Sequence, residues 1–208
     1  MNKFLPTGSI LLVLAIFTGA AQKPKQIRDV DFKNLIYGWD HPGHAVPLTW
    51  QWMKEPPKSK IRLQDGRAAF TESHESAQFE QGSPCINIVG VTYGDLDGNG
   101  AQAAAVRLNY RTGGTANWDY LYLYRLDHGR VRLLGRLRSG SRADGGLLRV
   151  TVKKNLLVLD FADAERRMGD CCSEGYIRVN FAWRHGHFEE TGPRERGDLT
   201  VQTLEHKE

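Results

Sequence analysis

The alternation of hydrophobic and polar positions dominates the chain from Cys85 onward and predicts a series of β-strands. Every second residue of 104–110 is apolar or aromatic, and the following segments repeat this pattern between short turns. We expect strands over 86–94, 102–110, 118–126, the arginine-rich segment 130–138, 147–152, 156–161, 176–183 and 187–190. No helical pattern interrupts them, so the sequence predicts an all-β fold. We expect an antiparallel meander in the form of a sandwich, an open barrel or a propeller-like sheet.

The residues before this region have a different character. Residues 22–82 contain scattered prolines and tryptophans without a sustained period, which is typical of an irregular lead-in. Tryptophans are costly to leave in water, so we expect this segment to lie against the core. Asp65-Gly66 predicts one hairpin within it. The predicted β domain then covers residues 83–193, and residues 194–208 form a polar C-terminal tail.

The first residues of the chain resemble a secretory signal peptide. Lys3 precedes the apolar run Ile10–Phe17, and small residues follow at Thr18–Ala21. The apolar run is shorter than the roughly 20 residues that span a bilayer, and no later segment approaches that length. The sequence therefore predicts a signal peptide over residues 1–21. We expect export to a periplasm or the extracellular medium, without a transmembrane segment after cleavage.

Composition narrows the function classes. With 40% hydrophobic and 25% charged residues the chain is neither disordered nor fibrous. The 28 basic and 24 acidic residues give a net charge of +4, which is too small to indicate nucleic-acid binding.

An arginine row stands out within this modest charge. Four arginines in the segment after residue 129 share one parity, so a regular strand would place them on one face and Val131, Leu133 and Leu137 on the other. We expect the row to be exposed and to contribute little to stability. It is either a plain solvated face or a surface for an anionic glycan, phosphate or envelope partner. The row consists of Arg130, Arg132, Arg136 and Arg138.

The sharpest motif is the loop Gly94-Asp95-Leu96-Asp97-Gly98-Asn99-Gly100, between two predicted strands. Oxygen side chains at Asp95, Asp97 and Asn99 alternate with other residues and could converge on a hard cation such as Ca²⁺. The alternative is a turn held by its own side chains. A full calcium loop would carry further acidic residues where Ala103 and Val106 stand, so we expect weak calcium binding that Ala103→Glu would tighten.

This loop, followed by Ala104-Ala105-Val106, resembles an FG-GAP (integrin-propeller-type) repeat loop. In those repeats the loop binds calcium, and the resemblance assigns this role to Asp95, Asp97 and Asn99. Only one copy is visible. The chain as a whole resembles uncharacterised secreted bacterial proteins with a single such loop. That resemblance rests on residues 31–34, 112–115, 142–146, 169–172 and 184–188.

Three cysteines, Cys85, Cys171 and Cys172, would meet an oxidising compartment after export. We expect Cys85 to pair with Cys171 or Cys172, because a bridge between neighbouring cysteines strains the peptide bond they share. A Cys171–Cys172 bridge is the alternative.

Other candidate chemistry is weaker. His41/His44 and His185/His187 have metal-compatible spacings without a third ligand, and the loop 73–76 offers nucleophile-type residues without a nucleophile elbow. The sequence thus favours an exported, non-catalytic β domain that acts as a binding or structural module. The alternative is an envelope hydrolase acting on glycans or phosphoesters through residues that converge only in the fold.

Overall fold

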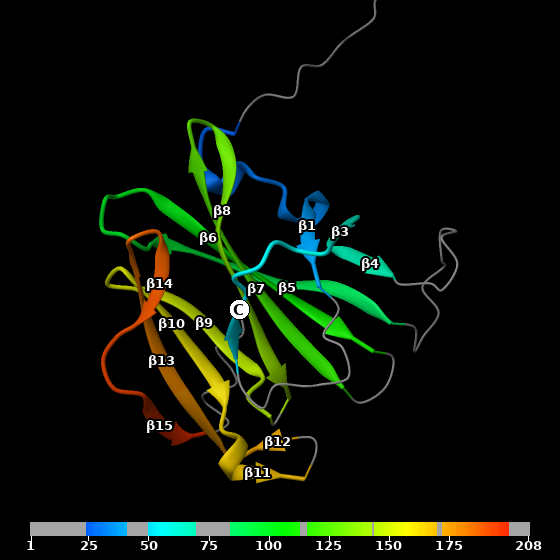
Figure 1. Ribbon diagram of the computed structural model, residues 1–208, viewed down its shortest axis with the longest axis vertical. Helices are drawn as coiled ribbons and strands as arrows, with labels where there is room; N and C mark the ends of the chain where they lie inside the picture. The colour runs from blue at the N-terminus through cyan, green and yellow to red at the C-terminus, as the bar shows by residue number, and fades with distance from the viewer. Residues whose placement is uncertain are drawn as a thin grey trace, which may run out of the picture.

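The computed structural model describes residues 24–40, 50–69, 84–112, 116–142, 144–169 and 172–199. Two antiparallel sheets lie face to face, and the N-terminal segment covers the far side of one of them (Figure 1). The expected all-β antiparallel fold is therefore confirmed, in the form of a sandwich with a third layer. Within the described residues, no helix is long and apolar enough to cross a membrane.

The first sheet has six strands in the order β2-β8-β7-β6-β5-β4. Its four long strands follow one another along the chain as a meander, because each is joined to the next by a short connection. The strands are β2 (Gln51–Trp52), β4 (Arg67–Ala69), β5 (Cys85–Asp95), β6 (Gln102–Arg111), β7 (Asn117–Asp127) and β8 (Arg130–Ser141).

The chain crosses to the second sheet after β8. This sheet has the order β14-β13-β10-β9. β14 pairs with the C-terminal part of β13, and β15 pairs with its N-terminal part. Its strands are β9 (Leu147–Lys153), β10 (Leu156–Ala162), β13 (Gly175–Arg184), β14 (His187–Glu190) and β15 (Glu195–Asp198). The segment predicted as a polar tail over 194–208 thus contributes a strand to this sheet.

The two sheets bury a shared apolar layer, here called the inter-sheet core. Odd-numbered residues of β6 and β7 face residues of β10 and β13 across it, as the period of two requires. Ala103 and Ala105 are small, which leaves room for larger side chains opposite. The layer contains Leu96, Ala103, Ala105, Leu121, Leu123, Leu137, Leu147, Leu157, Leu159, Phe161, Val179, Phe181 and Phe188.

The opposite face of the six-stranded sheet is buried as well. The even-numbered residues Ala104–Tyr110 of β6 and Trp118–Tyr124 of β7 pack against the N-terminal layer. That layer consists of η1 (Ile27–Asp29), η2 (Phe32–Asn34) and the two-stranded sheet β1 (Ile36–Trp39) and β3 (Ser59–Arg62). We call the buried side chains between them the N-terminal core.

Tyrosine hydroxyls tie the N-terminal layer to the sheet. Tyr122 donates to the carbonyl oxygen of Gly38 at 2.6 Å, and Tyr120 donates to that of Asp40 at 3.0 Å. Burial raises the pKa of both phenols, which keeps them protonated as donors. The layer is therefore held by hydrogen bonds as well as by apolar packing.

The described parts of the lead-in lie against the core, as its tryptophans predict. Trp39 is buried beside Tyr120, with ring centroids 4.5 Å apart. Trp50 stacks on Phe161 at 4.3 Å, and Trp52 stacks on Phe188 at 4.8 Å. β2 thereby closes the edge of the sandwich next to β8.

The predicted Asp65-Gly66 turn is also present. Both residues have positive φ, 50° and 83°, and the flanking Gln64 and Arg67 form an antiparallel bridge. Positive φ at both central positions is the signature of a type I′ hairpin turn. A small two-stranded sheet, β11 (Arg167–Met168) and β12 (Cys172–Ser173), follows η3 (Ala164–Arg166).

Candidate functional site

The loop of residues 94–100 joins β5 to β6 at one end of the sandwich. Its apolar residue, Leu96, is buried in the inter-sheet core. Gly94 lies against β9, where an added Cβ would come within 2.4 Å of Val152 Cγ1. Packing against the inter-sheet core and against β9 therefore fixes the first half of the loop without the help of an ion.

The carboxylate of Asp95 organises the loop backbone. Its Oδ1 accepts the N–H groups of Asp97 at 3.1 Å and Gly98 at 2.8 Å, and its Oδ2 accepts that of Gly100 at 2.8 Å. The N–H of Gly100, followed by those of Gly98 and Asp97, holds the pKa of Asp95 below its usual value. Asp95 is therefore an ionised acceptor for the turn.

Asp97 and Asn99 complete the loop. Asn99 Nδ2 donates to Asp97 Oδ2 at 2.9 Å, and Asn99 Oδ1 accepts the N–H of Ala101 at 2.7 Å. Arg125 Nη1, from β7, lies 3.6 Å from the same Asp97 oxygen. The structure thus brings the three predicted side chains into one loop, where each one bonds to neighbouring protein groups.

Ala103 and Val106, the positions where a full calcium loop would carry further acidic residues, face away from the loop. Ala103 is buried in the inter-sheet core and Val106 in the N-terminal core. A carboxylate at position 103 would lie among apolar side chains, so we now expect Ala103→Glu to destabilise the fold instead of tightening calcium binding. Within the described residues, no group of three or more His, Cys, Asp or Glu side chains converges into a metal site.

Changing Asp95 to asparagine should lower the free energy of unfolding at neutral pH, because an amide nitrogen cannot accept the N–H of Gly100. Since the folded-state pKa of Asp95 is lowered, its stabilisation is present above the unfolded-state pKa and is lost as the pH falls through the folded-state value. Urea unfolding of both proteins at neutral pH and at about pH 2 measures the difference. A difference of equal size at both pH values would contradict a role for the carboxylate charge.

The predicted arginine row is divided between two faces of β8. The register against β7 shifts so that Leu123 pairs with Gly135 and Tyr124 with Leu133, leaving Leu134 as an extra residue. Such a bulge reverses the alternation of the residues that follow it. The expectation of one exposed row is therefore wrong.

The consequences differ for the two halves of β8. Arg130 and Arg132 lie before the bulge and are exposed. After it, Arg136 and Arg138 pair with Tyr122 and Tyr120 on the face of the N-terminal core. Leu137 is fully buried as expected, but Leu133 remains 41% exposed.

Arg136 is the most deeply buried of these arginines, with 4% of its surface exposed. Its Nη1 lies 2.9 Å from Asp40 Oδ2, and its Nη2 donates to the carbonyl oxygen of Glu55 at 2.6 Å. Asp40 also accepts the N–H of Lys58 at 2.8 Å. Arg136 therefore connects β8 to both ends of the segment between β1 and β3, as a structural ion pair.

The expected pairing of Cys85 with one of the later cysteines is not found. Cys85 has a free thiol and starts β5 in the six-stranded sheet, whereas Cys172 lies in the separate β11–β12 sheet. Asn87 Nδ2 lies 3.4 Å from the Cys85 sulfur. Cys171 is outside the described residues, so a Cys171–Cys172 bridge stays a prediction.

Alkylation of the unreduced, denatured protein should label Cys85, because its thiol is not bridged in the fold. Mass spectrometry of the proteolytic peptides identifies the modified residue. A Cys85 peptide recovered unlabelled and joined to a peptide with Cys171 or Cys172 would contradict the structure and restore the original expectation.

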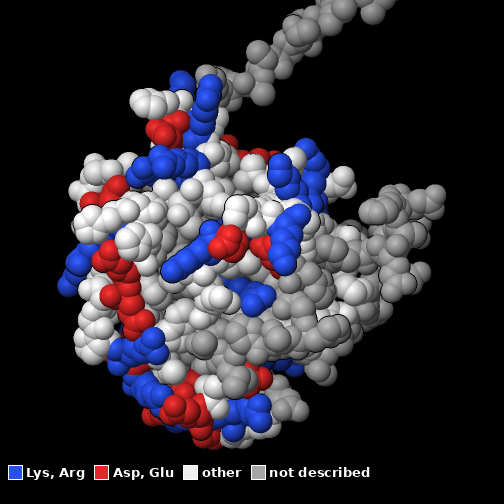
Figure 2. All heavy atoms as spheres, in the orientation of Figure 1, with Lys and Arg blue, Asp and Glu red and all other residues white. Residues whose placement is uncertain are grey.

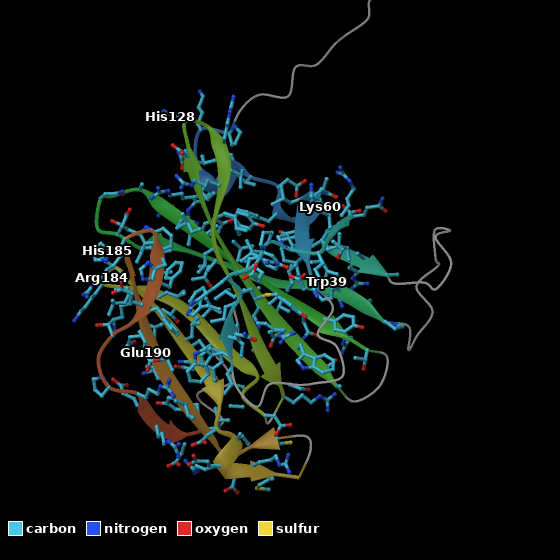
Figure 3. All side chains as sticks on the ribbon, in the orientation of Figure 1. Trp39, Lys60, His128, Arg184, His185 and Glu190 are labelled. Carbon is cyan, nitrogen blue, oxygen red and sulfur yellow. The ribbon has the colours of Figure 1, made fainter. Side chains whose placement is uncertain are left out.

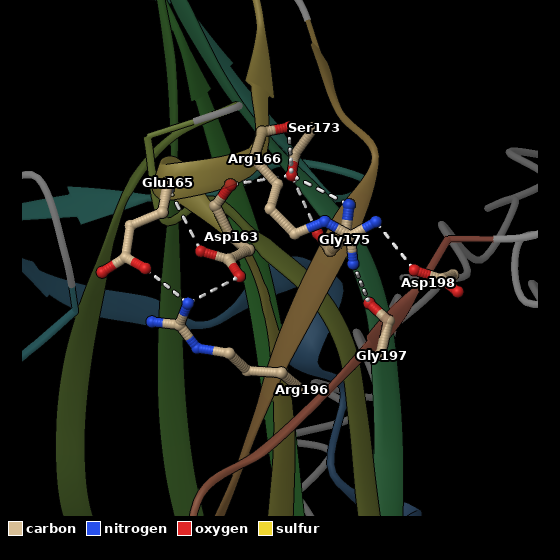
Figure 4. Close-up of polar contacts among 8 residues, drawn as sticks. All are labelled: Asp163, Glu165, Arg166, Ser173, Gly175, Arg196, Gly197 and Asp198. Atoms are coloured by element: carbon tan, nitrogen blue, oxygen red, sulfur yellow. Dashed lines mark hydrogen bonds and ion pairs between the residues drawn. The ribbon is translucent and has the colours of Figure 1, made fainter.

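An ion-pair network that the sequence did not reveal lies at the far end of the second sheet (Figure 4). Arg196 of β15 pairs with Glu165 and, at 3.4 Å, with the fully buried Asp163. The bond from Arg196 lowers the pKa of Glu165. Arg166 pairs with Asp198 at 2.7 Å. The charged residues of 195–198, with Arg196 between Glu195 and Asp198, were the available signal for these contacts.

The described histidines are exposed, and they take part in no group of three or more His, Cys, Asp or Glu side chains that could hold a metal ion among the described residues. His185 lies in the β13–β14 turn and His128 in the β7–β8 turn, which are apart from each other in Figure 3. His187 and His185 both contact Glu189, at 2.9 Å and 3.5 Å. His41, His44, the loop 73–76 and residues 1–21 lie outside the described residues.

Comparison with known proteins adds no functional assignment. No family model, curated protein or solved structure matches the chain significantly.

Proposed function

We propose that this chain is an exported, non-catalytic β domain that acts as a structural or binding module. The observation that carries the proposal is the pairing of its buried charged side chains with each other or with neighbouring charged groups. Within the described residues, every buried charged side chain belongs to an ion pair that joins strands or layers. These pairs are Arg107–Asp119 at 2.8 Å, Asp40–Arg136 at 2.9 Å, Asp160–Arg178 at 2.7 Å and Asp163–Arg196 at 3.4 Å.

The Arg107–Asp119 pair illustrates this use. Asp119 accepts from Arg107 at one oxygen and from Asn109 Nδ2, at 3.0 Å, at the other. Arg107 also donates to the carbonyl oxygens of Leu147 and Leu148 at the start of β9. The pair thus connects β6, β7 and the start of β9, so its charges support the packing of the two sheets.

Turnover assays test the proposal against the hydrolase alternative. The purified protein is incubated with 4-nitrophenyl glycosides and with bis(4-nitrophenyl) phosphate, with and without calcium. We expect no release of nitrophenol above the buffer rate. Turnover that co-purifies with the protein and disappears in Asp119→Asn or Asp160→Asn, while the variant still folds by circular dichroism, would overturn the proposal.

We further propose that calcium is an accessory ligand of the 94–100 loop. The support is the placement of Asp95, Asp97 and Asn99 in one turn together with the resemblance of the motif to calcium-binding repeats. The hydrogen bonds of Asp95 already stabilise this turn. Calcium affinity should therefore lie at the weak end of extracellular sites, about 10⁻⁴ to 10⁻³ M.

Millimolar calcium should raise the melting temperature slightly, in line with about 1 kcal/mol of added stability or less. Asp97→Asn should abolish this rise, whereas Asp127→Asn, an acidic residue at the end of β7 outside the loop, should retain it. Scanning calorimetry with and without calcium measures the shifts. An unchanged melting temperature at ten times the calcium level would reject the ion and leave the hydrogen-bonded turn.

A further inference from the structure

A regular cationic row lies on β3 and the residue before it. Lys58, Lys60 and Arg62 alternate with Ser59, Ile61 and Leu63, and the three basic side chains are exposed while Ile61 and Leu63 are buried. Alternate strand residues are about 6.6 Å apart, so the row extends over about 13 Å. Figure 2 shows basic side chains gathered over β1 and β3, and Figure 3 places Lys60 there.

The described residues provide no ion-pair partner for these three side chains. Across the sheet, Arg62 pairs with Ile36 and Lys60 with Gly38, so the positions opposite these two residues carry no acid. Among the ion pairs of the described residues, none involves a member of the row. Asp40 accepts the backbone N–H of Lys58 at one carboxylate oxygen and pairs with Arg136 at the other.

The face lacks the side chains that other anionic partners would need. Stacking of nucleic-acid bases and insertion into a membrane interface both use exposed aromatic residues. The aromatic residues of β1, Tyr37 and Trp39, point inward and are buried, and Ile36, 44% exposed, is the one large apolar residue presented on this strand. A row of cations on a polar face suits a polymer with repeated acidic groups and no bases or acyl chains.

We propose that Lys58, Lys60 and Arg62 form a docking surface for an anionic polysaccharide. This inference rests on the proposed role as a binding module and names its partner class. The two statements fail separately, because enzymatic turnover would overturn the module, whereas loss of polysaccharide binding would overturn only the docking surface.

Binding of dextran sulfate, measured by calorimetry at low and moderate salt, tests the surface. We expect binding that weakens with salt and falls about tenfold or more in Lys60→Glu/Arg62→Glu. The matched control is Lys153→Glu/Lys154→Glu, which changes the net charge equally at the exposed β9–β10 turn and should bind as the parent does. Circular dichroism checks folding, and Lys60→Gln/Arg62→Gln replaces the first variant if it does not fold.

Three outcomes would overturn the proposal. Absence of binding is the first, and an equal loss in the test and control variants, which would indicate net charge alone, is the second. The third is tighter binding to vesicles of phosphatidylglycerol and phosphatidylcholine than to dextran sulfate with the same dependence on Lys60 and Arg62, which would assign the row to a membrane.

Discussion

Replacing Arg136 by alanine is expected to lower the free energy of unfolding by about 3 to 5 kcal/mol, the usual cost of breaking a buried ion pair. The change removes the bond to Asp40 and the bond to the carbonyl oxygen of Glu55. It also leaves the carboxylate of Asp40 with reduced compensation, since its side chain is only 16% exposed. Urea denaturation followed by tryptophan fluorescence measures the loss.

Two further variants separate this ion pair from a general effect of removing arginine. Arg132→Ala should cost about 1 kcal/mol or less, because that side chain is 59% exposed and lies 3.6 Å from Asp127. The double variant Asp40→Ala/Arg136→Ala should recover part of the single loss, since no lone charge remains. Equal losses in Arg132→Ala and Arg136→Ala would contradict the bulge in β8.

Leu137→Ala should destabilise the protein by about 2 to 5 kcal/mol, whereas Leu133→Ala should cost about 1 kcal/mol or less. Leu137 is fully buried in the inter-sheet core, opposite Leu121, while Leu133 is 41% exposed. Both are leucines on the same strand with the same parity in sequence, so each serves as the control for the other. Thermal or urea unfolding of the two variants measures the difference.

A similar loss in both leucine variants would mean that the strand runs without a bulge and that Leu133 also lies inside. A loss confined to Leu133 would place the register shift elsewhere in the strand. The comparison therefore tests the orientation of β8 and does not depend on any ligand.

The long strands could be predicted from sequence because the pleat itself imposes a period of two. The segments 102–110 and 118–126 correspond to β6 and β7 within one residue at each end. The third layer could not be predicted in this way. Both parities of β7 are hydrophobic or aromatic, which indicates burial on both faces, but the sequence does not show which segment covers the second face.

The division of the arginine row has a different origin. A bulge depends on how two strands fit together, and within β8 the only local sign is Gly135, since glycine in a strand often marks such a site. A prediction based on the alternation within one strand assigns every residue after the bulge, relative to the residues before it, to the wrong face of the sheet. This is why Arg130 and Arg132 were placed correctly and Arg136 was not.

For the loop, spacing was sufficient to predict that Asp95, Asp97 and Asn99 share one turn. It could not predict the direction of their oxygen atoms, because the backbone N–H groups of Gly98 and Gly100 compete with any cation for the same carboxylate. The alternation along β6 does indicate which way position 103 points. Ala103 lies on the face opposite Ala104 and therefore points between the sheets.

The N-terminal layer affects the order in which parts of the protein can fold during synthesis on the ribosome. Residues 24–40 are synthesised before β6 and β7, yet Phe32, Tyr37 and Trp39 make ring contacts with tyrosines of those strands. Contacts across such long stretches of chain form slowly, and exposed aromatic residues favour aggregation while they wait. The segment that is made early must therefore dock late, and a factor that shields it during synthesis would raise the yield of folded protein.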